Sequence, residues 1–197
     1  MAHPRTRMRR DTAETRDRLL DAAGELLAER GTAFTLPDLA RASGVATATV
    51  YRHFAGVHDV FAEFYQRLID ELVAELGGLS AHTQGRRRFE AACARWVVLA
   101  AGWGRAATHI RSADGFLERV RRGDPPTSAL FEVLAAIIEE LVADGVLPPQ
   151  DVEYAVLVWV TLLDERVIVD LSSALGWSAK RVGHTLAESV LAALAVP

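Results

Sequence analysis

The stretch from Phe34 to Phe54 constrains this chain most, because it predicts two short helices joined by a tight turn. Thr35 is a favourable N-cap for the first helix, and Asp38, three residues later, can complete a capping box. Gly44 can adopt the left-handed backbone that ends a helix. The first helix is therefore expected to begin just after Thr35 and to end at the turn that contains Gly44.

The second helix of this stretch is expected from about Thr47 to Phe54. Val50 and Phe54 are spaced i and i+4, which places them together on the buried side. The opposite side is short, small at its N-terminal end, and rich in hydroxyls and hydrogen-bond donors. It carries Thr47, Ala48, Thr49, Tyr51, Arg52 and His53. A helix with such a face can enter a major groove, where small residues meet base edges and donors meet phosphates.

The run Thr35-x-x-x-Leu39-Ala40-x-x-Ser43-Gly44-Val45-x-x-Ala48-Thr49-Val50-Tyr51-x-His53-Phe54 resembles the DNA-binding signature of the TetR family of bacterial transcription regulators. The resemblance covers about residues 12–60 by motif, and the remainder only by length and helical pattern. It implies that Thr47 and Ala48 meet base edges. It also implies that Thr35, Thr49, Tyr51, Arg52 and His53 meet mainly phosphates.

Two residues depart from the family pattern. Ala46 stands where the family usually carries a capping Ser or Thr, so Thr47 is the neighbour that can take over the cap. His58, before Asp59, stands where the family usually carries Lys. A neutral imidazole is a weaker phosphate partner than an ammonium, so the sequence leaves a phosphate contact at His58 open.

Charge is distributed unevenly along the 197 residues. Residues 1–60 carry nine Arg and eight acidic residues, a net charge of +1, whereas the rest of the chain carries −5. Residues 1–10 contain four Arg and no acid, and we expect them to form a flexible basic arm that can reach DNA. The alternative is a solvated tail without a function.

Several classes of chemistry have no signal in the sequence. Cys93 is the only cysteine, which excludes an intrachain disulfide and fits a cytoplasmic protein. We find no signal peptide, no membrane-spanning segment, no metal-ligand spacing and no catalytic constellation. The expectation is a protein that is not an enzyme and has no cofactor or metal.

The periodicity predicts an all-α chain with two domains. The basic arm of residues 1–10 is followed by a three-helix DNA-binding domain of the helix-turn-helix type over residues 11–56. A connecting helix is expected over residues 57–76 and a helical ligand-binding and dimerisation domain over residues 77–197. Within the first domain, we expect the first helix to begin near Asp11.

Aromatic residues interleaved with small ones mark a candidate effector site in the second domain. The candidate lining residues are Trp96, Ala100, Trp103, His109, Phe116 and Phe131, with His109 bringing a polar group near the aromatic stripe. The alternative for each of these residues is ordinary core packing.

The last part of the chain predicts a subunit interface. Between Val152 and Leu171 the apolar residues of one expected helix point nearly all round, which requires burial on all sides. We expect this helix and a final helix, about Ser178 to Leu194, to pair with their copies in a homodimer. The candidate interface residues are Val156, Trp159, Leu163, Val167, Leu186 and Val190. A deeply buried central helix in a monomer is the alternative.

Together these features indicate a ligand-responsive regulator that binds double-stranded operator DNA as a homodimer. The resemblance implies a repressor that a small apolar or aromatic molecule releases from a palindromic operator. The alternative is a helical small-molecule-binding protein or enzyme in which the helix-turn-helix is only a packing module.

Overall fold

The computed structural model describes residues 4–79, 83–110 and 114–195, with the backbone alone for residues 4–10 and 105. Within these ranges every regular element is helical, which confirms the predicted all-α class. No helix in the described part of the chain combines the length and hydropathy needed to cross a membrane.

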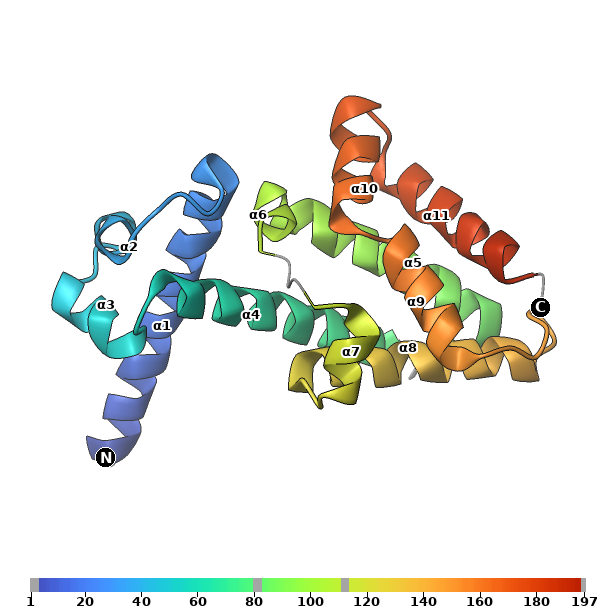
Figure 1. The fold of residues 1–197 in the computed structure, drawn as a ribbon, viewed down its shortest axis with the longest axis horizontal. Helices are drawn as coiled ribbons and strands as arrows, with labels where there is room; N and C mark the ends of the chain where they lie inside the picture. The colour runs from blue at the N-terminus through green and yellow to red at the C-terminus, as the bar shows by residue number, and fades with distance from the viewer. Residues whose placement is uncertain (1–3, 80–82, 111–113, 196–197) are drawn as a thin grey trace. The chain divides into compact units, whose positions relative to one another are not determined.

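The chain forms two compact units, and both contain segments that are distant in sequence. Unit 1 comprises Met1–Arg67 and Arg105–Arg111, and unit 2 comprises Leu68–Gly104 and Ser112–Pro197. Helix α4 (Val57–Gly78) begins in unit 1 and continues into unit 2 (Figure 1). The short helix α6 (Arg105–Thr108) contacts α1, so a segment that the sequence assigned to the second domain belongs to the first compact unit.

Unit 1 is built around a long first helix. Its elements are α1 (Pro4–Arg30), α2 (Leu36–Ser43), α3 (Thr47–His53), the start of α4, and α6. The buried apolar residues of α1 are Leu19, Leu20, Ala22, Ala23, Leu26 and Leu27. Helix α1 contacts α2, and α2 contacts α3. Helix α3 is therefore a short element that α2 supports.

Four helices of unit 2 form a closed ring of contacts. They are α5 (Gly85–Trp103), α8 (Pro125–Ala143), α9 (Val152–Leu162) and α11 (Ala179–Leu194). Helix α5 contacts α8, α8 contacts α9, α9 contacts α11, and α11 contacts α5. The short helix α7 (Phe116–Arg121) packs on α8. The apolar stripes of the four helices meet inside the ring and form the core of this unit.

The expected flexible arm is helical over most of its length. Helix α1 begins at Pro4 rather than near Asp11. Proline is favourable in a first helical turn, and the following run to Arg10 contains good helix formers and no glycine or further proline. Residues 1–3 of the expected arm lie outside the described residues.

The prediction of a single helix from Val152 to Leu171 is also wrong. Helix α9 ends at Leu162, a second helix α10 runs over Glu165–Val169, and a π-helical turn η2 follows over Asp170–Ala174. The Asp164 carboxylate accepts a hydrogen bond from the Arg166 backbone N–H at 2.9 Å and so caps α10. Aspartate at this position offers the backbone an alternative to the helical bond, which explains the break.

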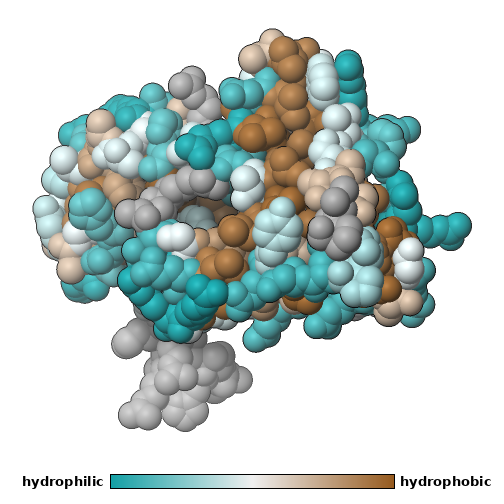
Figure 2. Space-filling model, turned by 45° about the vertical axis from the view of Figure 1, so that its right-hand side comes forward, coloured by the Kyte–Doolittle hydropathy of each residue, from teal (hydrophilic) through white to brown (hydrophobic). Residues whose placement is uncertain are grey.

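The apolar residues of this region are not all enclosed by the subunit itself. Tyr154 and Leu157 on α9, Val167 on α10 and Leu175 after η2 are exposed. Figure 2 shows hydrophobic residues gathered in a strip over α10 and η2. The prediction of burial on all sides is therefore not met within one chain, and an apolar surface remains.

Candidate nucleic-acid interface

The start of α2 has the predicted capping box. The Asp38 backbone N–H donates to Thr35 Oγ1 at 3.4 Å, and the Thr35 backbone N–H donates to Asp38 Oδ2 at 3.0 Å. The Thr35 hydroxyl also donates to Asp38 Oδ2, at 2.6 Å. These hydrogen bonds from Thr35 lower the pKa of Asp38, the side-chain bond first and the backbone bond second. The Thr35 hydroxyl proton is thus committed to the cap in the DNA-free chain.

The turn between α2 and α3 has the predicted left-handed glycine. Gly44 has a φ of 66°, and the Val45 N–H donates to the Ala40 carbonyl at 3.2 Å. From α1, Arg18 Nη2 donates to the Ser43 carbonyl at 3.3 Å. Sequence reasoning did not identify Arg18, because nothing local indicates that it lies beside the end of α2.

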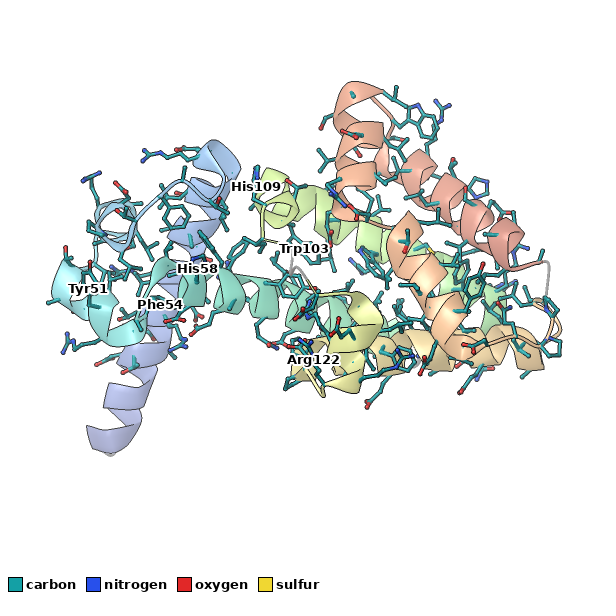
Figure 3. All side chains as sticks on the ribbon, viewed as in Figure 1. Tyr51, Phe54, His58, Trp103, His109 and Arg122 are labelled. Carbon is teal, nitrogen blue, oxygen red and sulfur yellow. The ribbon has the colours of Figure 1, made fainter. Side chains whose placement is uncertain are left out.

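Helix α3 is anchored on one side and open on the other. Val50 and Phe54 are buried, as predicted, and Arg16 of α1 lies over the Phe54 ring, 5.7 Å from its centroid. Tyr51 is 55% exposed and lies on the outer side of α3 (Figure 3). The outward side comprises exposed Thr47, Ala48, Tyr51 and Arg52 and half-buried Thr49 and His53.

The α3 N-terminus lacks a side-chain cap. Ala46 occupies the N-cap position and makes no side-chain bond, while Thr47 lies inside the helix, so the prediction that Thr47 takes over the cap is wrong. Further along, Arg52 Nη2 donates to Thr49 Oγ1 at 2.7 Å. This bond holds a cation and a hydroxyl together on the open face, an arrangement that suits a phosphate oxygen.

The start of α4 brings two more groups to unit 1. Asp59 Oδ2 accepts from the Ala55 N–H at 2.9 Å and from the Gly56 N–H at 3.2 Å, so Asp59 fixes the turn after α3. His58 is exposed and meets the Phe61 ring edge-to-face, with 6.0 Å between ring centroids. The structure thus places the residue that replaces the usual Lys at the surface of the same unit.

Contacts between α1 and α4 support the whole arrangement. Arg16 forms a two-bond ion pair with Glu63, one bond being Nε to Oε2 at 2.7 Å. Arg67 Nη1 lies 2.7 Å from Asp21 Oδ1. These pairs connect residues 46 or more positions apart, so they were not predictable from local pattern.

The predicted effector residues fall in different environments. Trp96 and Ala100 are buried in α5, and Phe116 and Phe131 are half-buried. Trp103 is half-buried, and its Nε1 donates to Glu71 Oε2 at 3.1 Å. His109 belongs to unit 1, and its ring lies beside Gly31 at the end of α1. His109 therefore belongs to a different compact unit from the other predicted effector residues.

Most of the predicted interface residues are core residues. Five of the six are buried within the single chain: Val156, Trp159, Leu163, Leu186 and Val190. Only Val167 is exposed, at 38%. This corrects the expectation for those five, because a face packed inside its own subunit cannot also meet a second copy. Helical periodicity identified the apolar positions but not the neighbours that cover them.

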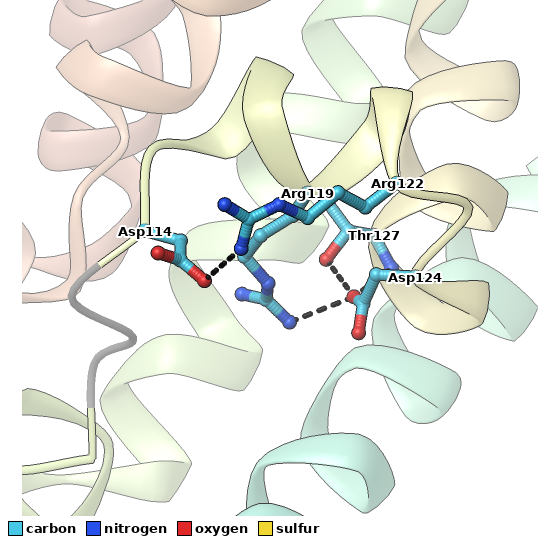
Figure 4. A network of polar contacts seen from close by, with 5 residues as sticks. All are labelled: Asp114, Arg119, Arg122, Asp124 and Thr127. Atoms are coloured by element: carbon cyan, nitrogen blue, oxygen red, sulfur yellow. Dashed lines mark hydrogen bonds and ion pairs between the residues drawn. The ribbon is translucent and has the colours of Figure 1, made fainter.

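A polar network fixes the junction of α7 and α8 (Figure 4). Asp124 Oδ2 accepts from the Thr127 hydroxyl, from the Thr127 N–H at 3.3 Å and from Arg119 Nη2 at 2.8 Å. Burial raises the pKa of Asp124, but the Thr127 bonds and the Arg119 charge outweigh burial, so the net pKa shift is downward. Arg122 is paired with Asp114 at 2.8 Å. These arginines are neutralised locally and do not form an open anion site.

Comparisons with known proteins agree with this geometry. Residues 19–64 match the family model described as bacterial regulatory proteins, tetR family. A search of curated proteins found no match. The chain is similar in structure to the fatty acid degradation regulator FadR of Bacillus halodurans, with a TM-score of 0.73 and 20% identity over 89% of this chain and 97% of that one.

Two further structures show the same fold. One is FadR of Bacillus subtilis in complex with stearoyl-CoA, with a TM-score of 0.72 and 17% identity over 88% of this chain and 96% of that one. The other is a regulatory protein of the tetR family from Rhodococcus RHA1, with a TM-score of 0.71 and 18% identity over 91% of this chain and 96% of that one.

The capped α2, the left-handed turn and the open face of α3 define a DNA-binding protein of the helix-turn-helix class. Within that class, residues 19–64 match the DNA-binding domain of bacterial regulatory proteins of the tetR family, as the motif indicated. Regulators of this family are generally non-enzymatic DNA-binding proteins.

Proposed function

We propose that the chain is a repressor that binds a palindromic operator as a homodimer and leaves it when a small apolar or aromatic molecule binds unit 2. The observation that carries this proposal is the open face of α3, anchored from behind by Val50 and Phe54. Thr47 and Ala48 would meet base edges there. Thr49, Tyr51, Arg52 and His53 would meet mainly phosphates, and Thr35 would do so only if its hydroxyl leaves Asp38.

A second copy is required because a two-turn helix reads few base pairs. Dimers of this class place two recognition helices about 34 Å apart, in successive major grooves. The exposed apolar residues Tyr154, Leu157, Val167 and Leu175 offer a surface for that pairing. This replaces the buried residues of α9 and α11 as the proposed contact surface. Operator binding would place the protein in the cytoplasm.

The effector would bind in unit 2, where Trp96 and Ala100 belong to a largely apolar core. FadR of Bacillus subtilis was solved with stearoyl-CoA, which supports including acyl compounds among the first molecules tested. Effector binding that weakens DNA affinity must be reciprocal, so operator DNA would weaken effector binding by the same factor.

The test is a gel shift with the DNA upstream of the chain's own gene, repeated at two salt concentrations. A regulator that contacts several phosphates is expected to lose affinity steeply as salt rises. A variant with Arg52→Ala should bind every DNA more weakly. Absence of a salt-sensitive shift, together with turnover of a small molecule, would instead support a helix-turn-helix that serves only for packing.

A further inference from the structure

Unit 2 contains buried hydrogen-bond donors that have no acceptor. Among the described residues, four buried side-chain atoms have no hydrogen-bond partner: Arg88 Nε, Trp96 Nε1, Trp159 Nε1 and Ser172 Oγ. All four belong to unit 2, and all four carry a proton that can be donated. Buried donors without acceptors are uncommon in folded proteins, so such a group calls for a physical explanation.

Trp96 is the clearest case. Its side chain lies on α5 and is only 3% exposed, next to the fully buried Val97 and Ala100. Its indole N–H can only donate. The α5 carbonyls accept within the helix, and the neighbouring side chains on this stripe are apolar. The protein itself therefore supplies no acceptor for this group.

Trp159 is a partial case. Trp159 Nε1 has no partner at hydrogen-bond distance. Burial raises the pKa of the Cys93 thiol, and an interaction with the Trp159 side chain offsets part of that rise. Sulfur is a weak acceptor. The Trp159 N–H is thus only weakly satisfied, and the ring itself packs on Phe89 with 4.7 Å between centroids.

The carboxylates of this core do not accept hydrogen bonds from these donors, because they have other partners. The Asp164 carboxylate binds Arg166, and the Glu140 carboxylate binds Arg88 and the Gly85 N–H. A cation that entered this core would meet indole N–H groups and carboxylates already engaged by arginines. A molecule with an acceptor oxygen could instead accept a hydrogen bond from one of these unpaired donors.

The regular α-helical backbone of unit 2 is interrupted at η2, which follows α10. Helix α10 packs on both α5 and η2, and Ser172 lies in the π-helical turn of η2. Single π-helical turns occur frequently at functional sites. The unpaired donors on α5 and η2 therefore belong to elements that share α10 as a neighbour.

We propose that the effector of unit 2 has an apolar body and an acceptor oxygen, neutral or anionic, that accepts a hydrogen bond from Trp96 Nε1. Cationic molecules of the same size are excluded by the same donors. The inference rests on the proposed function, in which unit 2 binds the effector, and it adds the chemistry by which that effector is selected.

The experiment uses the full chain with its tryptophan side chains labelled with ¹⁵N at the indole nitrogen. The probes are matched pairs that differ in their polar group: octanoate and octylammonium, dodecanoate and dodecylammonium, and benzoate and benzylammonium, all below micelle-forming concentrations. Two variants accompany them. Trp96→Phe removes the unpaired N–H, and Trp177→Phe is the matched control, since Trp177 is only half-buried and stacks on Arg181.

We expect at least one carboxylate to move the Trp96 indole proton downfield and to release DNA, and its matched ammonium to bind at least about tenfold more weakly. Trp96→Phe should weaken binding of that carboxylate about tenfold, whereas Trp177→Phe should leave it unchanged.

Three results would overturn the proposal. They are equal binding of the paired ammonium, unchanged carboxylate affinity in Trp96→Phe, and no shift of the Trp96 resonance with any carboxylate. A cross-peak from the Trp96 indole proton to a bound water in the probe-free protein would also overturn it, because water would then be the acceptor. Operator binding by the unliganded protein is independent of all these outcomes, so the two proposals fail separately.

Discussion

Gly24 lies within α1, where glycine is less favourable than alanine by about 1 kcal/mol. The structure gives a reason for its presence. A Cβ at this position would lie 2.9 Å from Cε2 of Phe64, whose ring is only 4% exposed and cannot swing into solvent. Helix propensity and side-chain packing therefore act in opposite directions at this residue.

We expect Gly24→Ala to destabilise unit 1 by about 1 kcal/mol, because overpacking costs about 1–3 kcal/mol and exceeds the gain in propensity. The measurement is a urea titration followed by circular dichroism. Gly102→Ala is the control, since Gly102 lies in α5 with nothing within 4 Å of the added methyl, and it should stabilise the chain. A stabilising effect of both substitutions would contradict the packing argument.

Tyr51 differs from Gly24 because its side chain is exposed and contributes little to the packing of the fold. Tyr51→Ala is expected to lower DNA affinity about tenfold and about equally on operator and unrelated DNA, since a phosphate contact carries no sequence information. Fluorescence anisotropy at fixed salt measures both affinities. A loss confined to operator DNA would instead assign Tyr51 to base recognition.

At the scale of whole elements, α11 and α5 of unit 2 approach each other closely at a glycine. A Cβ on Gly183 would lie 3.1 Å from the Cα of Ala94, so the small residue lets the two helices meet at the backbone. Gly183 belongs to the final helix of the chain. The structure identifies α5 of the same chain as its partner, whereas the sequence suggested a second subunit.

Gly183→Ala should therefore destabilise unit 2 by about 1–3 kcal/mol, because a helix backbone cannot move aside as a side chain can. Thermal unfolding of this variant is compared with that of Gly77→Ala, whose added methyl meets nothing within 4 Å. Equal melting temperatures for the two variants would show that α11 and α5 have room to separate.

The junction of α7 and α8 depends on pH through Asp124. Its pKa is raised by burial but lowered more by Thr127 and Arg119, so the folded value lies below the ordinary 3.8. The unfolded chain therefore binds the proton first as pH falls. The stabilisation is complete above the ordinary value and is lost as the pH falls through the folded value.

Asp124→Asn should consequently lose less stability than the parent chain between about pH 5 and pH 2. Unfolding midpoints across this range provide the comparison. Parallel pH profiles for the two proteins would mean that Asp124 contributes no charge-dependent stability.

At the scale of the whole molecule, the apolar surface of α9, α10 and the residues after η2 is the feature that one chain leaves exposed. Val167→Glu is expected to convert a dimer into a monomer in light scattering, because a charge placed in an apolar interface loses its hydration. Val98→Glu is the matched control, an exposed valine on α5. If Val98→Glu dissociates the dimer and Val167→Glu does not, the interface lies on another face.

Much of unit 1 was predictable from the sequence, for a local reason. The Thr35 cap, the Gly44 turn and the Val50 and Phe54 anchors each depend on residues within a few positions of one another. Such signals are independent of what packs around them. The start of α1 was not predictable from the arginine-rich composition, because such a run suits a flexible arm, whereas arginine is also a good helix former and the run is helical.

What the sequence by itself determined is the helical class, the helix-turn-helix and the outward face of α3, since caps, turns and short-range periodicity fix these locally. Only the tertiary structure decided which apolar residues of α9 and α11 face their own subunit and which face outward, and that α6 joins unit 1. A helix that is apolar nearly all round has no preferred side. Its burial is set by which distant helices cover it, and periodicity carries no information about those partners.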